Sequence, residues 1–235
     1  MKSAVVLVTG AAGAIGSAIV SALHNAGWSV IGLDLKFKDP QDELMQFVEL
    51  DLTDSAQLKK VLSDLKHSHY IQAVVNCAAI VKVGHFIDQD ENYWQDLVNV
   101  NLFAPLVICH ALLPDMISQQ NGQIINITSD SSRTGAAGEA VYSGTKGALV
   151  SFSKSLAQEV GRHGIRVNCV SPGVVDTPLI APNIELVSKL KRKIPLKRLA
   201  SPADIANMVS FLLSPQADYI TGQIMSVDGG LTMAD

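Results

Sequence analysis

The sequence has little cysteine, few aromatic residues and a small share of charged residues. Its three cysteines, Cys77, Cys109 and Cys169, lie far apart and form no CxxC pair. This spacing predicts buried thiols in a reducing compartment and argues against a disulfide framework or a metal site. No apolar run approaches the ~18 residues of a membrane span. A Thr-Gly turn also ends the run Ala4–Val8 where the apolar core of a signal peptide would continue. We therefore expect a cytoplasmic protein that binds no metal and no membrane.

The remaining composition favours one folded domain and disfavours nucleic acid as a partner. Apolar residues make up 48% of the 235 residues and charged residues 17%, which suits a large buried core and excludes a disordered chain. The formal net charge of −4 provides no broad basic field for a nucleic acid. The chain has no internal repeat and no linker-like tract, so we expect a single domain over residues 1–235.

Short apolar segments alternate with longer segments that have helical periodicity. The predicted strands are Ala4–Thr9, Val30–Leu35, Phe47–Leu52, Ala73–Cys77, Gln123–Thr128, Arg166–Val170 and Ile224–Val227. Helices are predicted near residues 15–26, 54–66, 92–118, 140–161 and 203–213, the last with Ser201 as its N-cap and Pro202 at its first position. Several strands are apolar on both faces, as in sheets covered by helices. The pattern predicts an α/β fold, a Rossmann-type doubly wound parallel sheet of about seven strands flanked by helices on both faces.

Residues 173–200 form the least regular part of the sequence. We expect residues 178–200 to act as a lid over the substrate, with a short helix around residues 184–193. The basic residues of this segment are Lys189, Lys191, Arg192, Lys193, Lys197 and Arg198. They can be a solvated helix face or a contact for an anionic substrate, and the sequence leaves both interpretations open.

The first predicted strand leads into the glycine-rich turn Thr9-Gly10-Ala11-Ala12-Gly13-Ala14-Ile15-Gly16, and a predicted helix follows. Gly10 permits a tight turn, whereas Gly13 and Gly16 remove side chains where backbone approaches a pyrophosphate or where helix meets strand. The start of the helix directs free N–H groups and a positive dipole end at the phosphates. Because the turn lies between a first strand and a helix, it predicts a dinucleotide site.

The second predicted strand carries Asp34 about 20 residues after the glycine turn, where a carboxylate hydrogen-bonds the adenosine ribose. The same carboxylate repels a 2′-phosphate, so we expect NAD as cofactor and NADP as the less favoured alternative. Lys36 and Lys38 are the counter-indication, since they would tolerate NADP. Asp51, followed by Leu52, ends the third strand at a position that would meet the adenine edge.

Tyr142 and Lys146 are four residues apart, which places both on one face of a predicted helix. A free tyrosine has a pKa of about 10, too high for an efficient base near neutrality, and a nearby ammonium would lower it. Ser129 follows a predicted strand, at the end where open α/β sheets bind ligands. Its hydroxyl is placed to hydrogen-bond a substrate oxygen that gains negative charge.

Together these residues resemble the short-chain dehydrogenase/reductase family, in its branch of roughly 250 residues, over nearly the whole chain. The resemblance rests on Thr9-Gly10 to Gly16, Asn76-Cys77-Ala78-Ala79, Asn101, Ser129, Tyr142 with Lys146, Pro172-Gly173 to Thr177, and Thr221-Gly222 to Val227-Asp228-Gly229-Gly230. Two motifs depart from the family pattern. Ala14 stands at the middle glycine of the turn, and Cys77 and Ala79 stand where Asn and Gly are commoner.

The resemblance implies a role for each matching residue. Tyr142 would be the general acid/base, Lys146 would lower its pKa and hold the nicotinamide ribose, and Ser129 would polarise the carbonyl. Asn101 would hold a water that links Lys146 to solvent. Asn76 and Ala78 would lie along the adenosine side, with Val175 and Thr177 at the carboxamide. The full set implied for the cofactor is Gly10, Gly13, Ala14, Ile15, Gly16, Asp34, Asp51, Leu52, Asn76, Ala78, Tyr142, Lys146, Pro172, Gly173, Val175 and Thr177.

We therefore expect an oxidoreductase that transfers a hydride between NAD(H) and a secondary alcohol or carbonyl of a small polyol, sugar or hydroxy acid. One alternative is an NADPH-dependent 3-oxoacyl-thioester reductase, which the segment 194–199 favours and Asp34 disfavours. Another is a non-catalytic NAD(H)-sensing module, which the complete set of four catalytic residues disfavours. The resemblance, with small apolar residues on the outer faces of helices 92–118 and 140–161, implies a homo-oligomer, a tetramer or dimer.

Overall fold

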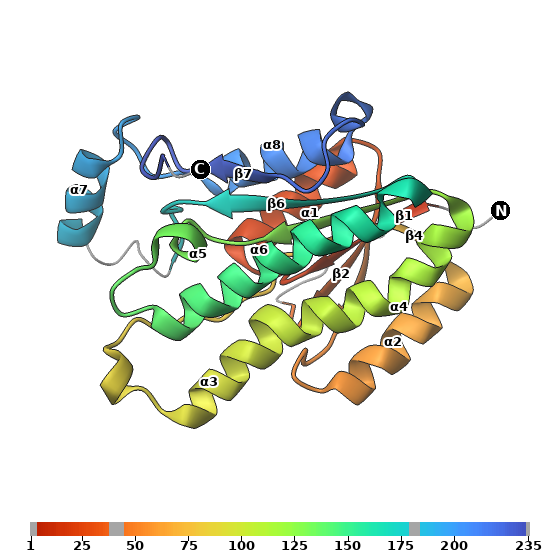
Figure 1. Ribbon diagram of the computed structural model, residues 1–235, viewed down its shortest axis with the longest axis horizontal. Coiled ribbons are helices and arrows are strands. Elements are labelled where there is room, and N and C mark those ends of the chain that lie inside the picture. The colour runs from red at the N-terminus through yellow and green to blue at the C-terminus, as the bar shows by residue number, and fades with distance from the viewer. Residues whose placement is uncertain (1–3, 38–44, 179–183, 234–235) are drawn as a thin grey trace.

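The computed structural model describes residues 4–37, 45–178 and 184–233 (Figure 1). Within these residues seven strands form one sheet in the order β3-β2-β1-β4-β5-β6-β7, and every neighbouring pair is parallel. The strands are β1 (Ala4–Thr9), β2 (Ser29–Asp34), β3 (Met45–Glu49), β4 (Tyr70–Asn76), β5 (Gly122–Ile127), β6 (Ile165–Pro172) and β7 (Ile224–Val227). This architecture confirms the predicted doubly wound parallel sheet.

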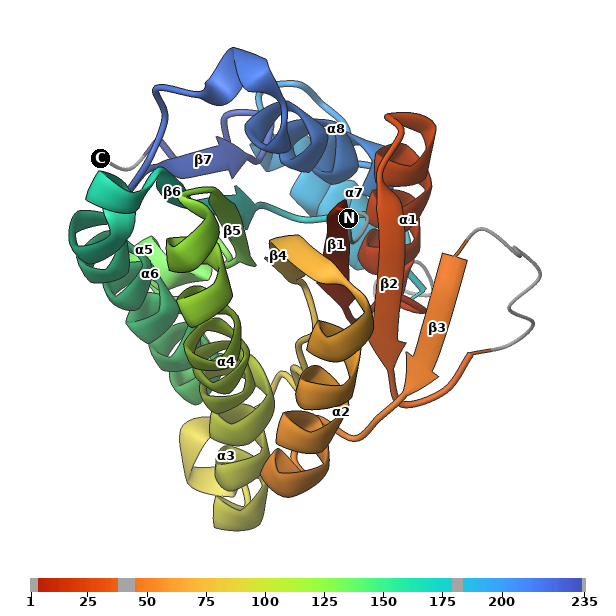
Figure 2. The same cartoon turned by 90° about the vertical axis from the view of Figure 1, so that its right-hand side faces the viewer.

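The strands are apolar on both faces because helices cover both faces of the sheet. The helices are α1 (Ala14–Asn25), α2 (Ser55–Ser68), α3 (Glu91–Val98), α4 (Ala104–Gln119), α5 (Ser131–Thr134), α6 (Ala140–Val160), α7 (Ile184–Lys193) and α8 (Pro202–Leu213). Helices α2, α4 and α6 pack on one face, whereas α1 and α8 pack against each other on the opposite face (Figure 2). Helix α8 begins as predicted, with Ser201 as N-cap and Asp204 completing a capping box.

The predicted helix over residues 92–118 has an interruption that the periodicity does not reveal. A π-helical segment, Asn99–Phe103, joins α3 to α4 within one continuous helical run. By length and composition this run, Glu91–Gln119, could cross a membrane, contrary to the expectation that no stretch approaches such a span. Core side chains account for this composition, because Ile108, Leu112 and Met116 are buried against the sheet.

The strand order places a ligand crevice between β1 and β4, where the chain reverses its direction of strand addition. Helix α7 stands beyond the carboxyl end of β6 in Figure 1, on the side of the sheet where a lid is expected. It matches the short helix predicted at 184–193. Of the expected lid, residues 179–183 lie outside the described part of the chain. The end of the segment is anchored, because Ile194 is buried and Ala200 N donates to Val174 O at 3.0 Å.

Candidate active site

The glycine turn after β1 has the close backbone contacts that its sequence predicts. Gly10 has a φ of +67°, and a Cβ there would lie 2.8 Å from Ala78 Cα. A Cβ on Gly16 would lie 1.9 Å from Gly10 O, so α1 could not approach the turn with any side chain there. Helix α1 follows with Gly13 as N-cap and no side-chain cap. Its first N–H groups are thus directed to the crevice, and this cradle fits the pyrophosphate of a dinucleotide.

The carboxylate of Asp34 is fixed at the end of β2 beside this turn. Its Oδ2 accepts from Ala12 N at 2.8 Å and its Oδ1 accepts from Leu35 N at 2.7 Å. These two N–H donors hold a negative charge at the edge of the predicted dinucleotide cradle. Asp51 has a local role as well, because its Oδ1 accepts from the backbone and hydroxyl of Thr53.

Asn76 points away from the crevice, although the resemblance implied a place along the adenosine. Its Nδ2 donates to Asn126 Oδ1 at 2.8 Å and lies 3.8 Å from Cys109 Sγ. The side chain is buried between the sheet and the α4–α6 layer. Only the backbone of Asn76 therefore remains for a cofactor, and its side chain belongs to the interior.

Tyr142 and Lys146 lie one turn apart on α6, with Lys146 Nζ 5.9 Å from the centroid of the Tyr142 ring. Lys146 is only 2% exposed, and its ammonium donates to Ile127 O at 2.8 Å. Ser129 follows β5 and hydrogen-bonds Tyr142. The structure thus brings Ser129, after the carboxyl end of β5, together with Tyr142 and Lys146 in the first turns of α6.

Burial dominates the acid–base properties of this group. It raises the pKa of Tyr142 to about 12, an effect that the hydrogen bond from Ser129 opposes and that the Glu139, Cys77 and Tyr93 groups reinforce. Burial also lowers the pKa of Lys146 to about 8. The expected lowering of the Tyr142 pKa by Lys146 is therefore not what this structure shows, because the ammonium is directed to Ile127 O and desolvation of the phenol prevails.

The Ser131 hydroxyl and the Glu139 carboxyl group lie close to Ser129 and Tyr142. Ser131 Oγ lies 3.0 Å from Ser129 Oγ and also near the Glu139 carboxyl group, and its single proton can be donated to only one of them at a time. Burial raises the pKa of Glu139, and the Ser131 hydroxyl partly opposes this. Ser131 and Glu139 lie between Ser129 and Tyr142 in the chain. The sequence analysis assigns roles to Ser129 and Tyr142 but to no residue between them.

Asn101 occupies the π-helical segment and is fully buried. Its Oδ1 accepts from Ile80 N and its Nδ2 donates to Ile80 O, each at 2.9 Å. Nδ2 also lies 3.5 Å from Thr145 Oγ1, whose hydroxyl donates to Tyr142 O at 2.7 Å. Asn101 thus connects the loop after β4 to the catalytic turn of α6; π-segments of this kind are frequent at functional sites.

The stretch from Pro172 to Thr177 lies beside Ser129, as the nicotinamide end of the site would require. Asp130 N donates to Pro172 O and Gly173 N to Val227 O, both at 3.1 Å. Val175 is buried and pairs with Ala200 in an isolated parallel bridge. The ends of β5, β6 and β7 therefore meet next to the catalytic hydroxyls.

Comparisons with known proteins agree with this geometry. The family model described as enoyl-(acyl carrier protein) reductase matches residues 10–232. This chain is a short-chain dehydrogenase/reductase. It is 32% identical to acetoacetyl-CoA reductase of Acinetobacter sp. (strain RA3849), over 97% of this chain and 98% of the relative. It is also 32% identical to 3-oxoacyl-[acyl-carrier-protein] reductase FabG of Thermotoga maritima, over 99% of each chain.

Solved structures give the same family. Aldohexose dehydrogenase of Thermoplasma acidophilum in ligand-free form superposes with a TM-score of 0.90 at 30% identity, over 100% of this chain and 96% of that one. The short-chain dehydrogenase/reductase described here is accordingly an NAD(P)-dependent oxidoreductase with a small-molecule substrate.

Thr9 belongs to the predicted glycine turn, but the sequence assigns no role to its side chain. Its Oγ1 accepts from Cys77 N and from Ala78 N, both at 3.1 Å, and so closes the crevice between β1 and β4. Tyr93 of α3 was also missed, although its phenol lies near enough to raise the pKa of Tyr142. Neither side-chain contact has a local signal, because each depends on packing between elements distant in the sequence.

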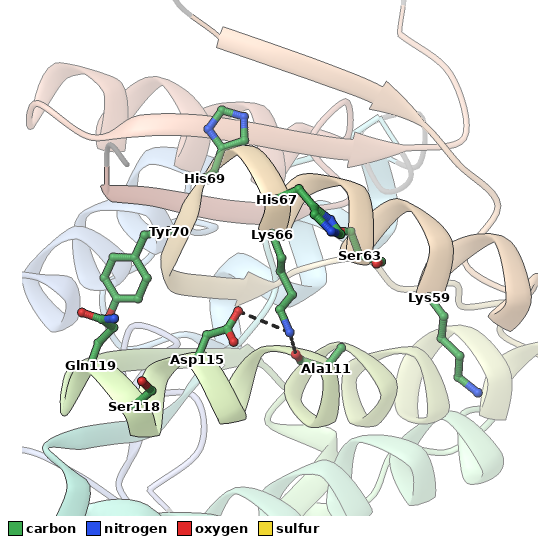
Figure 3. A pocket seen from close by; sticks show the side chains of 10 residues that line it. All are labelled: Lys59, Ser63, Lys66, His67, His69, Tyr70, Ala111, Asp115, Ser118 and Gln119. Carbon is green, nitrogen blue, oxygen red and sulfur yellow. Dashed lines mark hydrogen bonds and ion pairs between the residues drawn. The ribbon is translucent and has the colours of Figure 1, made fainter. Parts of the chain in front are cut away.

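A groove of about 900 Å³ lies elsewhere, between α2 and α4 (Figure 3). Tyr70 at the amino end of β4 lines it, so it opens at the end of the sheet opposite the dinucleotide crevice. Its Lys66 Nζ donates to Ala111 O at 2.7 Å and lies 3.3 Å from Asp115. This groove therefore contains none of the catalytic residues, and its central cation is already engaged within the chain.

Proposed function

We propose that this enzyme transfers a hydride between NAD(H) and a secondary alcohol or carbonyl of a small polyhydroxylated compound. A polyol or sugar is the preferred substrate class over a hydroxy acid. The observation that carries the proposal is the arrangement of Ser129, Tyr142 and Lys146 at the carboxyl ends of the strands, beside a cradle that fits a dinucleotide.

Each residue of the site would have a separate role in the transfer of the proton and the hydride. Tyr142 takes the hydroxyl proton in oxidation and returns it in reduction, and Ser129 holds the substrate oxygen by a hydrogen bond. The Lys146 ammonium donates to Ile127 O and lies 5.9 Å from the centroid of the Tyr142 ring, so its charge acts on the anionic phenol from a distance and not by direct contact. Bound NAD(H) supplies the acceptor or donor of the hydride. Asn101 keeps α6 in place through Thr145.

The choice of NAD rests on Asp34. Its carboxylate is fixed by two backbone N–H donors, so it cannot turn away from the ribose side of the cradle without losing both hydrogen bonds. A 2′-phosphate would have to approach this charge, whereas a 2′-hydroxyl can donate to it. Lys36, two residues after Asp34, is exposed, and its positive charge would favour NADP.

The preference for a polyhydroxylated substrate rests on Glu139. Its carboxyl group is half-buried beside Tyr142 and raises the pKa of that phenol. A carboxylate there accepts hydrogen bonds from substrate hydroxyls and repels a substrate carboxylate. An apolar acyl chain would leave it without a substrate partner.

The second candidate is an NADPH-dependent 3-oxoacyl-thioester reductase. Both sequence relatives described above are named as reductases of acyl thioesters, and further relatives have the same name as the second. The exposed basic residues of α7 and of the segment that follows would suit an anionic carrier, and those described are Lys189, Lys191, Arg192, Lys193, Lys197 and Arg198.

One experiment separates the two candidates. Initial rates are measured with NAD(H) and with NADP(H), over polyols, aldoses, hydroxy acids and 3-oxoacyl thioesters. The proposal expects the highest kcat/KM for a polyol or aldose with NAD. A clear preference for NADPH with an acyl thioester would replace it with the second candidate. NAD(H) binding without turnover of any of these substrates would favour the sensing module.

A further inference from the structure

Two buried carboxyl groups interact next to the active site, and one of them belongs to Asp130, the residue that follows Ser129. Asp130 follows β5 and is 6% exposed, and Asp228 follows β7 and is 9% exposed. Gly173 lies against both of them. A Cβ on Gly173 would be 2.7 Å from Asp228 Cβ and 3.3 Å from Asp130 Oδ2. The two carboxyl groups thus share one small space that only a glycine leaves open.

The hydrogen bonds of the pair are incomplete at one oxygen. Asp228 accepts from Gly230 N at 2.9 Å and from Thr232 N at 2.6 Å, one N–H on each of its oxygens. Asp130 Oδ1 accepts from Ser171 Oγ at 2.9 Å and lies 3.4 Å from Arg133. Asp130 Oδ2 is buried and receives no hydrogen bond from any described residue. A proton on Asp130 Oδ2 would satisfy this oxygen. It would also replace the repulsion between the two carboxylates with a hydrogen bond from Asp130 to Asp228.

The pair also lies at the junction of three parts of the active site. Asp130 is adjacent to Ser129 and its N–H donates to Pro172 O. Gly173 N donates to Val227 O, next to Asp228. A change in the separation of the two carboxyl groups therefore moves Ser129 relative to the turn that begins at Pro172.

We propose that Asp130 and Asp228 hold one proton between them and that this proton makes Asp130 a positioning residue for Ser129. Asp130 donates from Oδ2 to Asp228, and the hydrogen bond keeps the end of β5 against the turn after β6 and the segment after β7. The inference rests on the proposed function only in so far as Ser129 acts on the substrate.

The charges around the pair make this device sensitive to pH. Burial and the neighbouring Asp228 raise the pKa of Asp130 to about 6, against the opposing effects of Ser171 and Arg133. Arg133 of α5 also donates to Ser226 Oγ of β7, so it is the cation that faces the pair. As the pH rises past this value the proton leaves, two carboxylates face each other, and the tie between the three segments weakens.

The test compares the wild-type enzyme with Asp130→Asn, whose amide oxygen can still accept from Ser171 and whose NH₂ can donate to Asp228 at every pH. Infrared difference spectra with isotope-labelled aspartate should show a protonated carboxyl band in the wild type. This band should titrate away as the pH rises through about 6 and be absent from Asp130→Asn. Asp64→Asn, at an exposed position of α2, is the matched control and should keep the band.

The functional readout is single-turnover hydride transfer with saturating cofactor. As the band is lost, the wild-type rate should fall by roughly tenfold, less than the hundredfold that a 1 Å misplacement can cost. Asp130→Asn should keep the rate of the protonated form, while kcat changes more than KM. Absence of the band from the wild type, or the same pH-dependent fall in Asp130→Asn, overturns the inference. If no substrate supports turnover, the proposed function fails, while the infrared titration still decides whether the proton is shared.

Discussion

The carboxyl pair of Asp130 and Asp228 makes the free energy of unfolding depend on pH, and Asp130→Asn should remove that dependence. The native pKa of Asp130 is raised from 3.8 to about 6, a difference of about two. Each pKa unit corresponds to about 1.4 kcal/mol, which sets an upper limit of about 3 kcal/mol. Partial screening by nearby solvent and by Arg133 reduces this limit, so we expect roughly 1–2 kcal/mol.

The sign follows from the direction of the shift. A raised native pKa means that the native protein binds the proton more tightly than the unfolded chain does. The stabilisation is complete below the unfolded pKa and is lost as the pH rises through about 6. Asp130→Asn keeps a donor at every pH. It should therefore match the wild type at about pH 4 and exceed its unfolding free energy by roughly 1–2 kcal/mol at about pH 8.

Urea unfolding at the two pH values, at one fixed protein concentration, measures this difference directly. Thermal unfolding should show a gain of roughly 2–8 °C at the higher pH for a chain of this size. An equal effect of Asp130→Asn at both pH values would assign the change to packing and not to the proton. A less stable variant at the higher pH would refute the reasoning altogether.

Four further predictions test the rest of the site. Tyr142→Phe should lower kcat by roughly 10²–10⁴-fold and leave NADH binding, measured by fluorescence titration, nearly unchanged; undiminished turnover would remove the tyrosine from the mechanism. Asp34→Ser should improve kcat/KM with NADP by roughly tenfold or more, since a close charge pair is worth about 1–4 kcal/mol, and an unchanged cofactor ratio would contradict the assignment of Asp34. Gly16→Ala should cost roughly 1–3 kcal/mol of stability and weaken cofactor binding, because its Cβ would lie 1.9 Å from Gly10 O. Gly161→Ala is the control and should leave stability unchanged, because a Cβ there would have no atom within 4 Å. Light scattering should give the mass of a dimer or tetramer, and a monomer would exclude the proposed oligomer.

Much of the fold is predictable because its signals are local. Strands apolar on both faces, joined by helices, leave few arrangements other than a doubly wound sheet. The glycine turn is equally local, since Gly10 and Gly16 contact the same few residues of backbone. The spacing of Tyr142 and Lys146 needs only a helix to place both on one face.

The missed features all depend on contacts between distant parts of the chain. Asp130 and Asp228 meet only because β5, β6 and β7 end side by side. Asn76 follows the family pattern, yet its side chain is directed to Asn126 because the position faces the α4–α6 layer. The predicted effect of Lys146 on the pKa of Tyr142 considers charge alone, whereas the sign of the shift depends on how deeply the phenol is buried.

The placement of the catalytic group follows from a ladder of polar contacts between β5 and α6. Asn126 Nδ2 donates to Ser153 Oγ at 2.7 Å, and Lys146 Nζ donates to the carbonyl of the next residue, Ile127, at 2.8 Å. Farther along, Ser129 meets Tyr142. Each step toward the carboxyl end of the strand is a step toward the amino end of the helix. Ser153 is itself fixed, because its hydroxyl donates to Leu149 O.

This ladder explains why buried polar side chains are retained in an otherwise apolar layer. Apolar contacts alone specify the register of α6 on the sheet less sharply, since the hydrophobic effect is not directional. A buried hydrogen bond that is broken leaves an unsatisfied group, at a cost of about 1–3 kcal/mol. Asn126 and Ser153 therefore set the register of α6 on β5 in the interior. That register in turn fixes Lys146 and Tyr142 at the edge, where the chemistry takes place.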